Sequence, residues 1–193
     1  DPKFTLFWLD GNREIVQGRT IAEAMTLAGY SNGAIMAQTL ALCRPDLITH
    51  VIALAGFLVA PTDSHYCDPL LSSKRVHVTL VHGTLDLLIR YLGVGIGDDL
   101  ADVPSGTYLS FAQTSEAWRV ANGATGPFSS VGTGDFIDAI LGSEATISRP
   151  AAQVADATIE LVELNLAGHN PAFNASWLWW LENRIRAARR NTL

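Results

Sequence analysis

The sequence is short of cysteine and of long apolar runs. Its two cysteines, Cys43 and Cys67, allow at most one disulfide, which we expect only if the protein is secreted. The longest apolar run, residues 47–60, is too short to cross a bilayer. Residues 1–4 lack the charged and apolar regions of a signal peptide, as expected of a mature form or of a chain that never had one.

Basic residues are also scarce: 13 Lys and Arg stand against 19 Asp and Glu, and the net charge is −6. This balance disfavours a nucleic-acid or anionic-membrane surface, so we expect neither partner. The one basic cluster, at residues 184–190, suits the C-terminus of a helix. Apolar residues are abundant, at 48% against 17% charged, which predicts a compact globular protein with one domain over residues 1–193.

Apolar runs and helix-forming segments alternate along the chain, which predicts an α/β fold with a mostly parallel sheet between layers of helices. Strands are expected at 4–9, 24–28, 50–56, 75–83 and 157–164, and helices at 34–42, 108–122 and 175–190. Because 157–164 alternates apolar and polar residues, we place it near a sheet edge. Residues 93–107 and 123–150 are predicted to be loop-rich and to border a cleft. The last helix is expected to face the sheet with Trp177, Leu178, Trp180, Leu181 and Ile185.

The stretch Gly29, Tyr30, Ser31, Asn32, Gly33 reads G-x-S-x-G, the pattern of a nucleophile elbow between a strand and a helix. The glycines are needed because strand and helix cross so closely that a side chain at either position would collide. The serine at the turn must take a strained backbone conformation. The alternative interpretation is a glycine-flanked turn with an incidental serine.

A serine hydroxyl needs a base and an acid that orients the base. Asp86 follows the buried strand 75–83, and His169 follows the strand 157–164, so both lie where parallel strands place catalytic groups. The chain order Ser31, Asp86, His169 is that of α/β-hydrolases. In the alternative interpretation Asp86 forms a turn and His169 is an ordinary loop histidine. His82 is a rival base, but its place at a strand end favours a role in shaping the acid loop.

Metal and nucleotide sites are disfavoured, and we expect neither a metal nor a cofactor. His77 and His82 are five apart, which points them to opposite faces of a strand. No second ligand group near residues 65–68 has zinc spacing. The glycines of 93–97 are followed by Asp98 and Asp99, which would repel a pyrophosphate.

Three motifs carry a resemblance that covers about residues 24–190. Gly29–Gly33, His82–Asp86 with Tyr91 beyond it, and Ala167–Pro171 resemble the polyhydroxybutyrate depolymerase and feruloyl esterase group of α/β-hydrolases. Departures from that group are Ala34 after the elbow, Arg90 in place of a proline, and no tryptophan after His169.

The resemblance implies a serine esterase in which Ser31 is the nucleophile, Asp86 the acid and His169 the base. The implied substrates are carboxylic esters such as feruloylated or acetylated polysaccharides, or polyhydroxyalkanoates, and the implied location is extracellular. A serine peptidase with the same triad is a further alternative.

The oxyanion formed in such a reaction needs two backbone donors. One would be the N–H of Asn32, and the other normally comes from a loop after an earlier strand. Only 28 residues precede Gly29, and parallel crossovers need a dozen or more residues each. We therefore expect an N-terminally shortened fold without that loop, and reduced activity. The alternative function is a catalytically weak or inactive hydrolase-like binding module.

Overall fold

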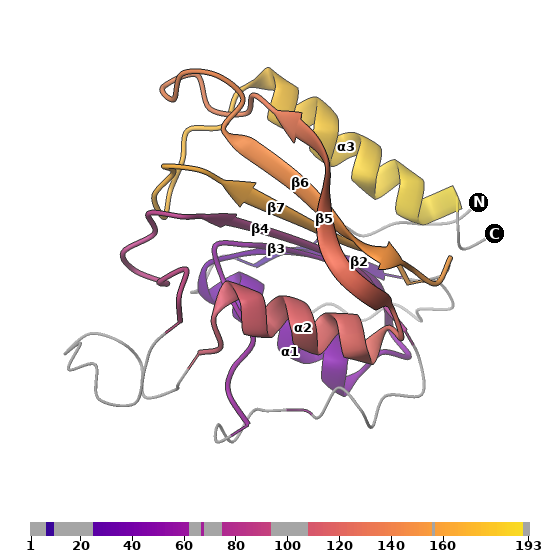
Figure 1. The fold of residues 1–193 in the computed structure, drawn as a ribbon. Coiled ribbons are helices and arrows are strands. Elements are labelled where there is room, and N and C mark those ends of the chain that lie inside the picture. The colour runs from indigo at the N-terminus through magenta and orange to yellow at the C-terminus, as the bar shows by residue number, and fades with distance from the viewer. Residues whose placement is uncertain are drawn as a thin grey trace.

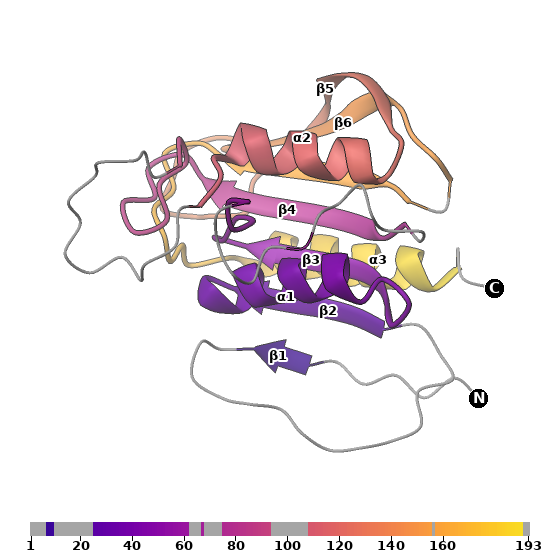
Figure 2. The same ribbon diagram turned by 90° about the horizontal axis from the view of Figure 1, so that it is seen from below.

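The computed structural model describes residues 7–9, 25–61, 67, 75–93, 108–155 and 157–190. Its strands join in one sheet of order β1-β2-β3-β4-β7-β6-β5 (Figures 1 and 2). The strands are β1 Phe7–Leu9, β2 Met25–Tyr30, β3 Ile48–Leu54, β4 His77–Gly83, β5 Thr125–Gly134, β6 Ala145–Ala152 and β7 Ile159–Leu164; the helices are α1 Asn32–Cys43, α2 Phe111–Ala121 and α3 Ala175–Arg190. Strands β1, β2, β3, β4 and β7 are parallel, and β6 and β5 extend the sheet antiparallel.

The sheet lies between two layers of helices, with α1 and α2 on one face and α3 on the other (Figure 1). Two cores result. Val51, Val78 and Leu80 pack on the α1 and α2 face, while Ile52 and Val81 pack with Trp177 on the α3 face. Because β3 and β4 are covered on both faces, they are nearly continuous apolar runs. The predicted α/β fold with a mostly parallel, helix-flanked sheet is confirmed.

The prediction of a loop over 123–150 is wrong, because this region contains β5 and most of β6. Nearly every residue of β5 is exposed, so the strand has no buried face and its sequence carries no apolar alternation. Of the expected loop 93–107, all but Gly93 lies outside the described residues. The expected strand 4–9 is described only from Phe7.

The prediction that 157–164 lies near a sheet edge is also wrong, since β7 lies between β4 and β6. Its polar positions are carboxylates with partners inside the protein. Glu160 is buried and pairs with Arg149 and Arg184, and Glu163 accepts a hydrogen bond from the hydroxyl of Tyr91. The alternation of apolar and polar residues, which suggests one solvent-exposed face, therefore reflects buried carboxylates that have hydrogen-bond or ion-pair partners.

Helix α3 buries Trp177 and Trp180 against the sheet, with Leu181 and Ile185 partly buried. The expectation that Leu178 shares this face is wrong, because Leu178 is 63% exposed. Consecutive helical positions are about 100° apart, which turns Leu178 away from the face that carries Trp177. Within the described part of the chain, no helix is long and apolar enough to span a membrane.

A polar pair lies on the α3 face of the sheet, toward the starts of β3 and β4. His50 and His77 are register partners, and the Nε2 of His50 lies 3.0 Å from the Thr79 hydroxyl. Burial first, and then the charges of His77 and Arg184, lower the pKa of His50 to about 3. His50 is therefore neutral in the folded protein at neutral pH.

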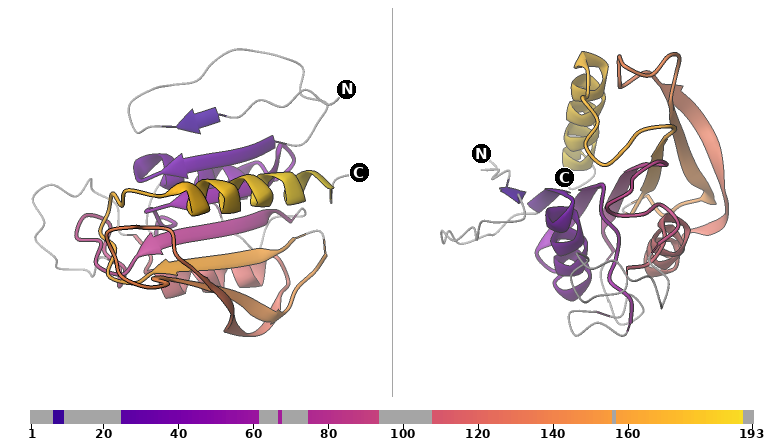
Figure 3. Two further views of the ribbon diagram at one scale, coloured as in Figure 1. Left: turned by 90° about the horizontal axis from the view of Figure 1, so that it is seen from above. Right: turned by 90° about the vertical axis from the view of Figure 1, so that its left-hand side faces the viewer.

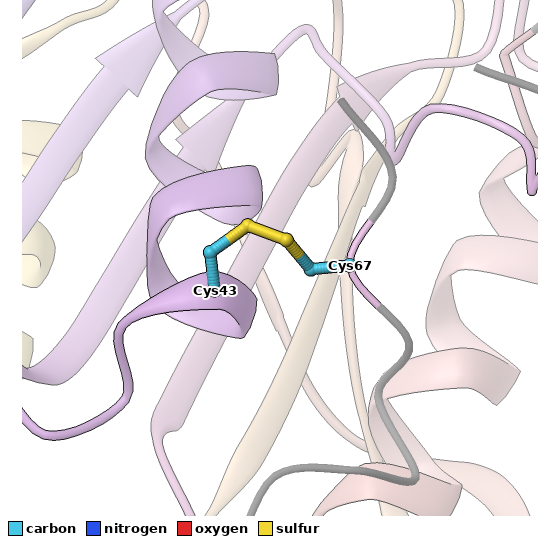
Figure 4. Close-up of a disulfide and its surroundings, with 2 residues drawn as sticks. All are labelled: Cys43 and Cys67. Atoms are coloured by element: carbon cyan, nitrogen blue, oxygen red, sulfur yellow. A yellow bond between two sulfur atoms is a disulfide. The ribbon is translucent and has the colours of Figure 1, made fainter. Parts of the chain in front are cut away.

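Cys43 and Cys67 form a disulfide with a Cα–Cα distance of 5.3 Å (Figure 4). Cys43 is the last residue of α1, so the bridge ties the end of the helix that follows the elbow to a segment 24 residues further along the chain.

Candidate active site

The predicted elbow joins the end of β2 directly to the start of α1. Ser31 at the turn has φ 54° and ψ −124°, a region that non-glycine residues avoid at a cost of about 1–3 kcal/mol. Two backbone contacts hold it there: its N–H donates to the carbonyl of Leu54 at 2.8 Å, and its own carbonyl accepts from Ala34 at 2.9 Å. The strained serine that the motif predicts is confirmed.

Gly29 lies where strand and helix cross. A Cβ at this position would lie 2.2 Å from the carbonyl oxygen of Gly33 and 2.6 Å from the backbone N of Ala34. Both are backbone atoms that cannot swing aside, so the steric reason predicted for Gly29 is confirmed. The backbone that such a Cβ would meet is that of Gly33. The steric clash predicted for a side chain at Gly33 itself stays a prediction.

The structure brings Ser31, Asp86 and His169 together at the carboxyl ends of β2, β4 and β7. The Ser31 Oγ lies 2.9 Å from His169 Nε2, although the two residues are 138 apart in the chain. The other ring nitrogen, Nδ1, lies 2.7 Å from Asp86 Oδ2. An ionised carboxylate only accepts hydrogen bonds, so Nδ1 carries the proton and Nε2 is free to accept one from Ser31.

The carboxylate of Asp86 is buried and held by several donors. Its Oδ1 accepts from the backbone N–H of Leu88 at 2.8 Å and of Ile89 at 2.9 Å, which folds residues 86–89 into a tight turn. Burial by itself raises the pKa of Asp86, but the hydrogen bonds from His169, Ile89 and Leu88 and the neighbouring His82 more than offset it, and the pKa lies below its ordinary value. The group is thus ionised at neutral pH.

His82 sits beside Asp86, whereas the ring nitrogen next to the Ser31 hydroxyl belongs to His169. Its Nε2 donates to the carbonyl of Ile89 at 2.8 Å and lies 3.3 Å from Asp86 Oδ2, while Phe57 stacks on its ring at 4.1 Å between centroids. Burial lowers the pKa of His82 to about 4, so this histidine is neutral. The expectation that His82 shapes the acid loop agrees with these contacts.

The loop that carries His169 is fixed from the elbow and from the acid loop. The hydroxyl of Tyr30, the residue before Ser31, donates to the carbonyl of His169 at 2.9 Å. The N–H of Leu85 donates to the carbonyl of Ala167, and a Cβ on Gly83 would lie 2.3 Å from that same oxygen. Tyr30 therefore holds the loop that carries His169, a contact that the motif alone did not predict.

Gln38 is a buried polar residue that joins several elements behind the elbow, and the sequence motifs do not mark it. Its side chain is fully buried; Nε2 donates to the carbonyl of Gly56 at 2.9 Å, and Oε1 accepts from the indole of Trp118 at 3.0 Å. It locks α1 to α2 and to the segment after β3. The available signal was an amide within an apolar helical run.

Residues 12–94 match the Phospholipase/Carboxylesterase family. The Phospholipase/Carboxylesterase match spans less than half of the chain; it contains Ser31 and Asp86 and ends before His169. Acetyl xylan esterase from Aspergillus awamori is a similar solved structure, with a TM-score of 0.46 and 12% identity over 82% of this chain. This chain covers 59% of that chain. The sequence matches none of the curated proteins searched.

Among the described residues, no group of three or more His, Cys, Asp or Glu side chains is arranged to hold a metal ion. The side chains gathered at this edge of the sheet are those of a hydroxyl, an imidazole and a carboxylate in series. Such a series can move a proton from the hydroxyl to the imidazole while the carboxylate stabilises the resulting charge.

Proposed function

We propose that this chain is a serine hydrolase that cleaves carboxylic esters through an acyl-enzyme, with Ser31 as nucleophile, His169 as base and Asp86 as acid. The observation that carries the proposal is the hydrogen-bonded series Ser31 Oγ–His169 Nε2 at 2.9 Å and His169 Nδ1–Asp86 Oδ2 at 2.7 Å. The strained Ser31 backbone and the Phospholipase/Carboxylesterase match over residues 12–94 support it.

In this reaction His169 Nε2 takes the proton of Ser31 as Oγ attacks the ester carbonyl carbon. The imidazolium that forms lies against the Asp86 carboxylate, which stabilises it. His169 then gives the proton to the leaving alcohol, and the bond to that alcohol breaks. Water, deprotonated by the same imidazole, hydrolyses the acyl-enzyme and restores Ser31.

The oxyanion would be stabilised first by the N–H of Asn32, which lies in the first turn of α1, where backbone N–H groups have no partner inside the helix. Each such donor lowers the barrier by about 3–4 kcal/mol. The expected lack of a second donor concerns the chain before Gly29, of which the structure describes only residues 7–9 and 25–28, so it stays a prediction.

Four exposed leucines belong to the loops that carry Asp86 and His169. Leu85, Leu87, Leu88 and Leu166 are each more than half exposed, at 53%, 81%, 64% and 67%. Exposed apolar side chains in these two loops favour esters that are uncharged near the reacting bond. With the resemblance of the motifs, it supports feruloyl or acetyl polysaccharide esters or polyhydroxyalkanoates as substrates. The disulfide between Cys43 and Cys67 supports secretion as the location.

The test compares hydrolysis of p-nitrophenyl acetate and butyrate by the wild type, Ser31→Ala and Ser129→Ala, a serine exposed on β5. We expect Ser31→Ala to lose essentially all turnover and all labelling by a fluorophosphonate, while Ser129→Ala keeps both. A wild type that is neither labelled nor faster than Ser31→Ala would overturn the esterase and favour the hydrolase-like binding module.

A further inference from the structure

A groove of about 530 Å³ lies on the α3 side of the molecule, apart from the triad. It runs between the end of β5 and the first turns of α3, two regions that lie side by side (Figures 1 and 3). The residues that line it include Thr133, Asp135, Phe136, Ser176, Trp179 and Trp180. None of the proposed catalytic residues is among them.

The wall of the groove combines an open aromatic face with polar groups. Trp179 is 69% exposed, although tryptophan contributes more free energy when it is buried than almost any other side chain. Thr133, Asp135 and Ser176 are exposed beside it and offer two hydroxyls and a carboxylate. Few polar groups around a large aromatic surface are typical of a ligand site.

A neutral pyranose fits this combination best. One face of a sugar ring is a sheet of C–H bonds whose partial positive charge suits the negative face of an indole. Its rim carries hydroxyls that can donate to a carboxylate and exchange hydrogen bonds with hydroxyls. Anionic ligands are disfavoured by Asp135 and by the net charge of −6.

The groove is held in fixed relation to the base. The N–H of Asn174 donates to the carbonyl of Phe136 at 2.8 Å, and its side-chain amide donates to the backbone carbonyl of Asp135 and to the carboxylate of Asp138. Asn174 follows His169 by five residues, a span of at most about 18 Å. A short stretch of a polymer can therefore lie in the groove while an ester on the same chain reaches Ser31.

We infer that this groove is an accessory binding site for a neutral polysaccharide, in which Trp179 stacks on a sugar ring. Its use during ester cleavage rests on the proposed function. Its binding of the sugar does not.

The experiment measures retention of the full chain by soluble xylan and hydroxyethyl cellulose in affinity electrophoresis, using wild type, Trp179→Ala and Leu178→Ala. Leu178 is the matched control, because it is the neighbouring exposed apolar residue of α3 and does not line the groove. We expect Trp179→Ala to weaken retention by about tenfold, and Leu178→Ala to retain wild-type binding. Both variants should hydrolyse p-nitrophenyl acetate like the wild type.

The inference is overturned if neither polysaccharide retains the wild type, or if Leu178→Ala weakens retention as much as Trp179→Ala. Trp179-dependent adsorption to polyhydroxybutyrate particles without retention by either polysaccharide would also overturn it. Retention of the Ser31→Ala variant by the polysaccharides is expected as well, because sugar binding in the groove does not need Ser31, and this separates the two proposals. Binding without any wild-type esterase activity would sink the proposed function and leave the groove assignment standing.

Discussion

Buried His50 makes the fold sensitive to acid. An unfolded histidine titrates near pH 6.5, whereas His50 in the fold has a pKa of about 3. Between these values the unfolded chain binds a proton that the folded chain does not, so the free energy of unfolding falls as the pH falls. The contribution of neutral His50 to the free energy of unfolding is fully present above pH 6.5 and is lost progressively as the pH falls from there toward 3.

The magnitude follows from the shift of the pKa. Each pH unit within this window costs about 1.4 kcal/mol, so His50 alone removes about 2 kcal/mol between pH 8 and pH 5. His82, with a pKa of about 4, removes a similar amount over the same range. Together they remove about 4 kcal/mol, a large share of the stability of an ordinary domain.

The test is urea unfolding of wild type and His50→Leu at several pH values from 8 to 5. Leucine keeps the volume and cannot titrate, so the wild type should lose about 2 kcal/mol more than His50→Leu over this range. Carboxylates and His82 contribute to both proteins and cancel in the difference. Thr79→Val, which removes the hydroxyl partner of His50 but keeps the imidazole, should show the wild-type pH dependence. Equal losses in the wild type and His50→Leu would refute the reasoning.

Three further perturbations test the elbow, the acid and the disulfide. Gly29→Ala should lower the free energy of unfolding by at least about 2–3 kcal/mol in urea titrations, because its Cβ would lie 2.2 Å from the Gly33 carbonyl oxygen, whereas Gly132→Ala, where a Cβ meets nothing within 4 Å, should change it little. Asp86→Asn should reduce turnover of p-nitrophenyl acetate about 10⁴-fold with an unchanged circular dichroism spectrum; turnover within tenfold of the wild type would contradict the role of Asp86. Replacing both Cys43 and Cys67 by serine opens a loop across 24 residues and should cost about 3–4 kcal/mol by the chain-entropy relation; a reducing agent should destabilise the wild type and leave the double variant unaffected.

The gathering of Ser31, Asp86 and His169 could be predicted because it follows from a topological rule. Parallel strands end at one edge of a sheet, so residues just after three such strands meet there. The rule needs only the strand ends, and Gly83, the last residue of β4, marks one of them. It does not reveal contacts such as that of Tyr30 with the carbonyl of His169, which depend on loop conformation.

The two wrong predictions about the sheet have one physical origin: apolar periodicity reports burial and not strand geometry. Strand β5 is exposed along nearly its whole length, so its backbone pairing with β6 leaves no mark on the sequence pattern. Glu160 misleads in the opposite direction. A glutamate in the sequence suggests a solvent-exposed position, but this carboxylate is buried and paired with Arg149 and Arg184. The positions of β5 and β7 in the sheet therefore could not be predicted from the apolar pattern.

The sequence separation of 138 between Ser31 and His169 has a kinetic consequence. Contacts that join distant parts of a chain form slowly, because the loop between them must be closed before any contact stabilises it. The hydroxyl of Ser31 and the imidazole of His169 meet only after β7 has paired with β4. In the sequence, α2, β5 and β6 lie between these two strands. Helix α1 needs no such closure. On refolding from urea, the helical circular dichroism signal should thus return first and nucleophilic reactivity at Ser31 last. The rate of fluorophosphonate labelling would then report when the sheet is complete.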